Sequence, residues 1–84
     1  MTKQLEFREG DMCKIIEIEM TDGLSQYKNE LNGQKVRFKH LGGIKENGFM
    51  ICVVTLPENI ENKKTLFHKN EPLYFTGVKL EKTN

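Results

Sequence analysis

Three cations at alternate positions are the first residues of this sequence that could bind a ligand. Lys35, Arg37 and Lys39 stand two apart in the stretch GQKVRFKH. Residues two apart on a strand point to one face at a spacing of about 6.8 Å, so the three side chains would span roughly 14 Å and meet about three phosphates. Three such contacts make duplex-DNA affinity fall about 40-fold between 50 and 200 mM salt. The pattern therefore predicts, as one candidate, a weak nucleic-acid interface.

The other candidate for this row is a solvated strand face whose charges are compensated within the protein. Glu17 and Glu19 also stand two apart, in the preceding apolar stretch. In an antiparallel pair they would lie across from two of the three cations, and each such pair contributes about 0.2–1 kcal/mol. We expect the compensated face, and keep nucleic-acid binding as the alternative.

The two tyrosines are the candidate residues for contact with a protein partner. Tyr27 falls in a polar stretch, and Tyr74 is out of phase with the apolar Leu73 and Phe75. Both are therefore candidates for exposure, and exposed tyrosine is enriched where proteins bind each other. The alternative is that both are partly buried with their hydroxyl groups in water.

The remaining reactive side chains form no catalytic or metal-binding motif. His40 and His68 are isolated, and Cys13 and Cys52 lie in apolar runs without the close spacing of zinc-binding or redox cysteines. We expect two buried thiols, with a disulfide as the alternative. Ser25 is the only serine, and no base is paired with it in the sequence. The sequence thus predicts a protein that is not an enzyme and has no metal or cofactor.

The elements that position these residues are short strands. Period-two alternation predicts a strand at 12–20, with Ile16, Ile18 and Met20 inward, and a second at 34–41. The apolar run 49–56 predicts a third strand, covered on both faces. The further strand candidates are a start at 66–68 and the segments 72–75 and 77–82 on either side of Gly77. We count five short strands in all.

The connections between the strands carry turn signals. Asn47-Gly48 predicts a hairpin between the second and third strands. Asp22-Gly23 and Asn32-Gly33 favour tight turns, so residues 21–33 are predicted to be a long ordered loop. The spacing of Leu24, Tyr27 and Leu31 would also suit a helical turn, which is the alternative. Residues 57–65 are predicted to be a solvated loop or a ragged hairpin arm.

Length and charge limit the fold and the partner. A chain of 84 residues with short strands and no helix predicts one all-β domain over 1–84, a small barrel that hides its sheet edges, with its core barrel at 9–82 and residues 1–8 irregular. Thirteen basic and twelve acidic residues give a net charge of +1, without the excess of non-specific nucleic-acid binders. The absence of a signal sequence or membrane span predicts a cytoplasmic protein.

Three stretches resemble the SH3-like small β-barrels, particularly single-domain bacterial and phage forms that overlap with KOW-like folds. They are EGDMCKIIEI at 9–18, ELNGQKVRFK at 30–39 and EPLYFTGVKLEK at 71–82. The resemblance implies a five-stranded SH3-like barrel that is a binding module. In such barrels the loop after the first strand lies near the C-terminal strands, so the resemblance also implies that Tyr27 and Tyr74 share one patch. The chain departs from the KOW pattern, because Lys35-Val36-Arg37 replaces the G-x-V step. It also lacks the Trp and the acidic loop with which peptide-binding SH3 domains hold proline helices.

These observations predict a non-catalytic adaptor that contacts a protein partner, as a monomer or a homodimer. The many Lys and Asn residues and the lack of Ala suit an AT-rich coding genome, and hence a phage- or mobile-element-encoded accessory protein. The alternative is a weak nucleic-acid-binding module of the KOW or Tudor kind, which would use Lys35, Arg37 and Lys39 with Tyr27 or Tyr74 for base stacking.

Overall fold

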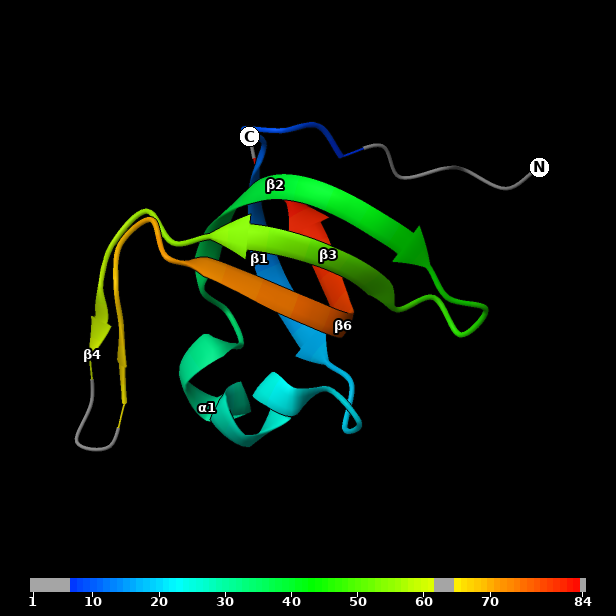
Figure 1. The fold of residues 1–84 in the computed structure, drawn as a ribbon, viewed down its shortest axis with the longest axis horizontal. Coiled ribbons are helices and arrows are strands. Elements are labelled where there is room, and N and C mark those ends of the chain that lie inside the picture. Colours follow the sequence, from blue (N-terminus) through cyan, green and yellow to red (C-terminus); the bar gives the residue numbers. More distant parts are fainter. Residues whose placement is uncertain (1–6, 62–64, 84) are drawn as a thin grey trace.

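Four antiparallel strands form one strongly curved sheet (Figure 1). The computed structural model describes residues 7–61 and 65–83. The strands of the sheet are β1 (Met12–Ile18), β2 (Lys35–Ile44), β3 (Met50–Thr55) and β6 (Pro72–Lys82). They pair in the order β1-β2-β3-β6, and β6 pairs in turn with β1, so the hydrogen-bonded order is cyclic. The mostly β fold is thus confirmed.

A two-stranded arm projects from this ring. It consists of β4 (Ile60–Glu61) and β5 (Leu66–Phe67), which pair only with each other (Figure 1). The hairpin-arm alternative for 57–65 is therefore the right one, although 62–64 lie outside the described residues. The predicted count of five strands is not found, because 72–82 is one continuous strand and the arm is a separate sheet. Residues 1–6 of the segment expected to be irregular also lie outside the described residues.

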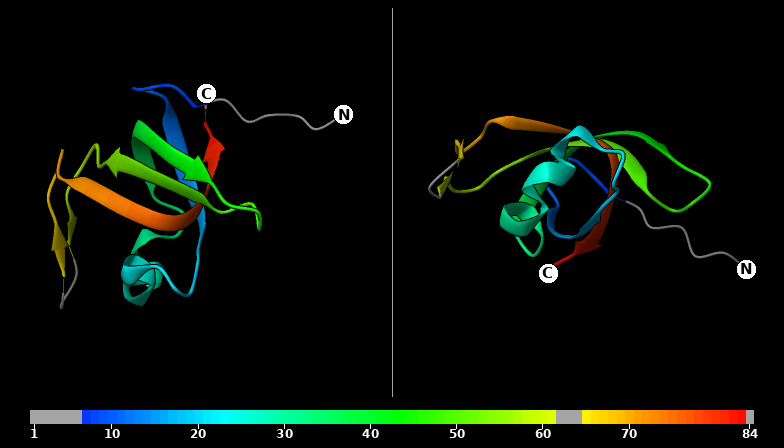
Figure 2. Two further views of the ribbon diagram at one scale, coloured as in Figure 1. Left: turned by 45° about the vertical axis from the view of Figure 1, so that its right-hand side comes forward. Right: turned by 90° about the horizontal axis from the view of Figure 1, so that it is seen from below.

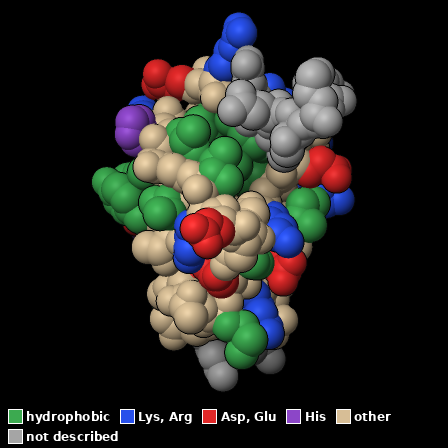
Figure 3. Space-filling view, turned by 90° about the vertical axis from the view of Figure 1, so that its right-hand side faces the viewer, with side chains coloured by type: hydrophobic (Ala, Val, Ile, Leu, Met, Phe, Trp, Pro, Cys, Tyr) green, Lys and Arg blue, Asp and Glu red, His purple; other side chains and the backbone are tan. Residues whose placement is uncertain are grey.

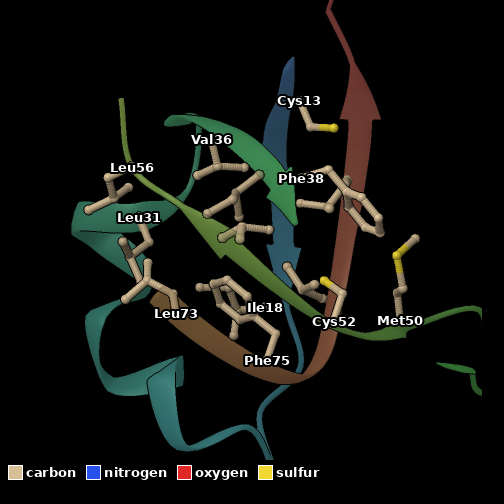
Figure 4. Close-up of a cluster of buried hydrophobic side chains, with 14 of the residues drawn as sticks. Cys13, Ile18, Leu31, Val36, Phe38, Met50, Cys52, Leu56, Leu73 and Phe75 are labelled. Carbon is tan, nitrogen blue, oxygen red and sulfur yellow. The ribbon is translucent and has the colours of Figure 1, made fainter. Parts of the chain in front are cut away.

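The core fills the space that the four strands enclose (Figure 4). Inward side chains alternate over residues 35–39 of β2 and over residues 72–77 of β6, and the phase of β6 changes between Gly77 and Val78. Phe7, next to β1, stacks on Phe38 with ring centroids 5.3 Å apart. The buried hydrophobic residues are Cys13, Ile15, Ile18, Leu31, Val36, Phe38, Met50, Cys52, Val54, Leu56, Phe67, Leu73, Phe75, Val78 and Leu80.

The predicted loop at 21–33 is wrong, because most of it is helical. A 3-10 helix spans Gly23–Tyr27, and the α-helical turn α1 spans Lys28–Leu31. Leu31 is fully buried, while Leu24 and Tyr27 pack against the core. Burial of the residues spaced three and four apart therefore outweighs the turn tendency of the flanking Gly pairs. The two helical turns lie on the concave side of the arc formed by β2, β3 and β6 (Figure 2).

Asp22 fastens this helical segment to the sheet. Its side chain is 3% exposed and accepts a hydrogen bond from the backbone N–H of Leu24, 2.8 Å away, as an N-cap does. The same carboxyl group accepts bonds from the N–H groups of Thr76 (2.7 Å) and Gly77 (2.9 Å) in β6. One buried carboxyl group thus satisfies three backbone donors from two elements.

Two expectations about strand faces are also wrong. Ile16 is 45% exposed, because the β1–β6 register shifts between Ile15 and Glu17 and Ile15 points inward instead. Ile18 is buried as predicted, but Met20 lies after the end of β1 and is 87% exposed. The third strand is not covered on both faces, since Ile51 is 40% exposed. No helix of the described residues packs on the convex side of β3 (Figure 2).

Candidate binding face

The outer side of β2, β3 and β6 carries the residues best placed to meet a ligand. The strand register pairs His40 with Val53 and Val53 with Tyr74, so the three lie in one row across the strands. We call this surface the Tyr74 face. Its members are Arg37, Lys39, His40, Ile51, Val53 and Tyr74.

Apolar groups on this face are open to solvent. Tyr74 is 70% exposed, because Leu73 and Phe75 on either side of it point into the core. Ile51 lies on the same side of β3 as Val53, and its side chain sits close over Gly42, where a Cβ would come within 2.9 Å of the Ile51 Cγ2 atom. Gly42 therefore leaves room for Ile51 to lie flat beside the row. In the view from the hairpin end, most visible hydrophobic side chains gather in the upper left, beside a histidine (Figure 3).

Tyr27 does not join Tyr74 in one patch. It is partly buried and packs against the core, and its ring meets Phe67 of the arm edge-on with centroids 5.3 Å apart. Tyr27 thus follows the alternative of partial burial, and its exposure is not found, whereas Tyr74 is exposed as predicted. A single exposed tyrosine is left on the outer face.

The cations of β2 are not compensated by Glu17 and Glu19. Lys35 pairs in register with Lys14, another cation, and the β1–β2 pairing ends before it reaches Glu17. Among the described residues, no hydrogen bond or ion pair engages the side chains of Lys35, Arg37 or Lys39. The expected compensated face is therefore wrong, and the physical reason is the register.

The two glutamates instead pair with other lysines. Glu17 lies 3.9 Å from Lys79 of β6, and Glu19 forms an ion pair with Lys45, which follows β2. The Lys45 Nζ atom also donates to the Thr76 carbonyl oxygen at 3.1 Å. The hydrogen bond from Lys45 is the main reason why the pKa of Glu19 lies below its ordinary value.

A cluster around Glu19 fixes the hairpin that presents the face. Asn47 of the tight turn donates from Nδ2 to Glu19 Oε2 at 2.6 Å. Gly48 has φ +89°, which confirms the Asn-Gly turn. A methyl group at Gly77 would overlap the Glu19 side chain, so glycine is needed there. These contacts tie the turn between β2 and β3 to β6.

Acidic residues are absent from the strand segments that build the face. Neither β2, β3 nor the stretch 72–76 of β6 contains Asp or Glu. A shift of register between Phe38 and His40 leaves Lys39 and His40 both exposed. Lys35 lies beyond the end of β3 and lines a groove with Glu58 and Glu61 next to the arm. The sequence missed Ile51 and His40 as surface residues, because neither the bulge nor the open face of β3 has a local signal.

The other reactive groups are engaged in structure. Cys13 and Cys52 are free and buried, which confirms the expected thiols, and burial raises their pKa values to about 11 and about 12. The Ser25 hydroxyl donates to the Met20 carbonyl oxygen at 3.1 Å. Within residues 7–61 and 65–83, no group of three or more His, Cys, Asp or Glu side chains could hold a metal ion.

No protein-family model matches the chain, and neither the curated proteins nor the solved structures contain a match. In the part of the chain that the structure describes, no helix has the length and apolar character needed to cross a membrane. The Tyr74 face is accordingly the basis for the function proposed for this chain.

Proposed function

We propose that this chain is a non-catalytic binding module, an adaptor that contacts a protein partner through the Tyr74 face. The observation that carries the proposal is the exposure of Tyr74, at 70%, in a row with Val53 and His40. Tyrosine is enriched among the residues that dominate binding energy, because a rigid ring buries a large area at little cost in side-chain entropy.

The residues around Tyr74 also support this proposal. Ile51 and Val53 extend the apolar surface along β3 next to Tyr74, and polar groups of β2 border it. An apolar centre with a polar rim is the usual anatomy of a protein interface. The face is held by paired strands on both sides of β3, so a partner would meet a rigid surface that needs no ordering on binding.

The finer fold proposed for this module is an SH3-like small barrel. The stretches that resemble that class fall on β1, on the entry to β2 and on β6, which are all members of the cyclic sheet. The Lys- and Asn-rich composition is the support for an accessory role encoded by a phage or mobile element. The module would act as a monomer or a homodimer, which a mass measurement in solution distinguishes.

A capture experiment with matched variants tests the protein-binding function. The immobilised chain is expected to retain a stoichiometric protein from a lysate of the host cell, and Tyr74→Ser is expected to abolish that retention. Met20→Ser is the control, because Met20 is 87% exposed but lies outside the face. Recovery of no stoichiometric protein, or equal recovery by the Tyr74→Ser variant, would overturn the proposal.

Weak nucleic-acid binding is the second candidate, and the unpaired cations of β2 favour it. Lys35, Arg37 and Lys39 with Tyr74 would supply phosphate contacts and one stacking platform. Three phosphate contacts predict that single-strand affinity falls about 20-fold between 50 and 200 mM salt. Binding of labelled oligonucleotides at both salt concentrations tests this, and the absence of salt-dependent binding would remove the candidate.

A further inference from the structure

The charges of this chain are segregated in a way that the net charge of +1 does not reveal. All residues of β2, β3 and the 72–76 part of β6 lack a carboxylate side chain, while Arg37, Lys39 and His40 stand exposed on β2. The described ion pairs draw their acids from Asp11, Glu17 and Glu19, on β1 or adjacent to it. The Tyr74 face therefore presents positive charge that no ion pair among the described residues neutralises.

The cations and the apolar groups occupy different strands of the face. Neighbouring strands lie about 4.8 Å apart, so Tyr74 on β6 is roughly 10 Å from the cations on β2. Ile51 and Val53 of β3 fill the distance between them. A complementary ligand needs anionic groups along one edge and apolar groups along the other.

We infer that the protein partner contributes an acidic segment with an apolar or aromatic anchor, its carboxylates against Arg37 and Lys39 and its anchor against Tyr74 and Ile51. This inference rests on the proposed function and names the chemistry of the partner. Two observations support this inference. The exposed cations of β2 complement carboxylates, and the apolar side chains of Ile51, Val53 and Tyr74 lie beside those cations. Guanidinium and carboxylate groups also match geometrically, since two parallel N–H···O bonds can form.

A nucleic acid fits the same face less well. Proteins that bind single strands combine a cationic track with several aromatic platforms for successive bases. Here the exposed tyrosine ring is separated from the cations by the aliphatic side chains of Ile51 and Val53, and the imidazole of His40 is the one ring that lies beside the cations on this face. Aliphatic groups at that place suit an apolar side chain better than a base or a sugar.

The first arm of the test uses a defined probe, a fluorescent random copolymer of glutamate and tyrosine, in a binding titration by anisotropy. The face triple variant, Lys35→Gln, Arg37→Gln, Lys39→Gln, removes the two basic residues of the face, Arg37 and Lys39, together with the neighbouring Lys35. The wild-type chain is expected to bind the copolymer, and the face triple variant is expected to bind about 3-fold to 100-fold more weakly. Oligothymidylate of similar length is titrated in parallel. Failure of the copolymer to bind, or tighter binding of oligothymidylate, would overturn the inference.

A charge-matched control separates the face from net charge. The variant Arg8→Gln, Lys28→Gln, Lys69→Gln removes one arginine and two lysines that are exposed outside the face. It is expected to bind the copolymer within about twofold of wild type, a difference typical of surface charges that make no contact. Equal losses in the two triple variants would show that the face has no special role. Circular dichroism of each variant verifies that the fold is kept.

The same variants in the lysate capture distinguish failure of this inference from failure of the proposed function. Retention that depends on Tyr74 but survives both the face triple variant and 500 mM salt would leave the adaptor function standing and overturn the acidic partner. Retention that does not depend on Tyr74 would overturn the adaptor function itself. The expected result is loss of the captured protein in the face triple variant and its release by salt.

Discussion

Two outer regions of this sheet differ in whether their charged side chains form ion pairs. One is the side formed by β1 and β6, and the other is the Tyr74 face. On the β1–β6 side, Asp11 lies 3.3 Å from Lys82 and Glu17 lies 3.9 Å from Lys79. On the Tyr74 face the cations have no such partner among the described residues. Surface ion pairs add little stability, typically below about 1 kcal/mol, so pairing is not required for folding. The difference indicates which side of the molecule is left available to a ligand.

The largest effect on stability is expected from the carboxyl group of Asp22, which connects the helical segment to β6. Asp22→Ala removes the acceptor for three backbone N–H groups, of which the one at Gly77 is buried. Loss of such contacts is expected to lower the free energy of unfolding by about 3 kcal/mol. Urea denaturation followed by circular dichroism measures it. Asp22→Asn retains one acceptor oxygen and should lose less, and an Ala variant as stable as wild type would contradict the assigned role.

The next effect is a pH dependence of the folding stability, which arises from the ion pair between Glu19 and Lys45. The pKa of Glu19 is lowered from 4.5 in the folded chain, chiefly by the hydrogen bond from Lys45. Since the folded pKa is below the unfolded one, the stabilisation is complete above pH 4.5 and is lost as the pH falls through the folded value. The urea midpoint should thus decrease from pH 7 to pH 3 less in Glu19→Gln than in wild type. Glu81→Gln is the control, because Glu81 is exposed. A pH dependence of the urea midpoint in Glu19→Gln equal to that of wild type would contradict the prediction.

A smaller effect of opposite sign, a gain in stability, is expected from substitution of Lys35, at the contact between β1 and β2. Lys35 pairs with Lys14 across β1 and β2, and like charges directly opposite are unfavourable. Lys35→Glu should therefore raise the free energy of unfolding by about 0.2–1 kcal/mol. Lys35→Gln, which only removes the repulsion, should fall between wild type and Lys35→Glu in the same denaturation experiment. Destabilisation by both variants would mean that the Lys35 side chain has a structural contact of its own.

The smallest effect on stability is expected on the Tyr74 face itself. Tyr74→Ser removes a ring that is 70% exposed, so the unfolding free energy should change by no more than about 0.5 kcal/mol. Thermal and urea unfolding check this. A loss above about 2 kcal/mol, the range of buried side chains, would show that Tyr74 supports the fold instead of presenting a contact.

Local alternation in the sequence was sufficient to predict β2 and the two faces of β6. Val36 and Phe38 are buried between exposed cations, and Tyr74 is exposed between buried neighbours, because side chains alternate on a strand regardless of its partners. The turn at Asn47-Gly48 was predictable for the same local reason. These features are enough to propose Tyr74 and the cation row as site residues.

Features that depend on register or on distant contacts could not be predicted in this way. The irregularity near Ile16 reverses the phase of β1, and the register that places Lys14 opposite Lys35 is set by the whole sheet. Tyr27 is drawn inward by Phe67, which is far away in sequence. The charge pairing of the strands, and hence the free cations of the face, is a tertiary property.

The short seam between β1 and β2 has a consequence for the motions of the molecule. Three positions pair there in strand register, Met12–Lys14 with Lys35–Arg37, and the contact continues on both sides through backbone hydrogen bonds of residues outside the paired positions. Gly10 donates to the Phe38 carbonyl oxygen at 2.8 Å, and Gly33 donates to the Ile15 carbonyl oxygen at 2.7 Å. Backbone bonds at the irregular ends of a strand pair open locally before those in the middle of a sheet. The amide protons of Gly10 and Gly33 should therefore exchange with deuterium from solvent sooner than those of β3.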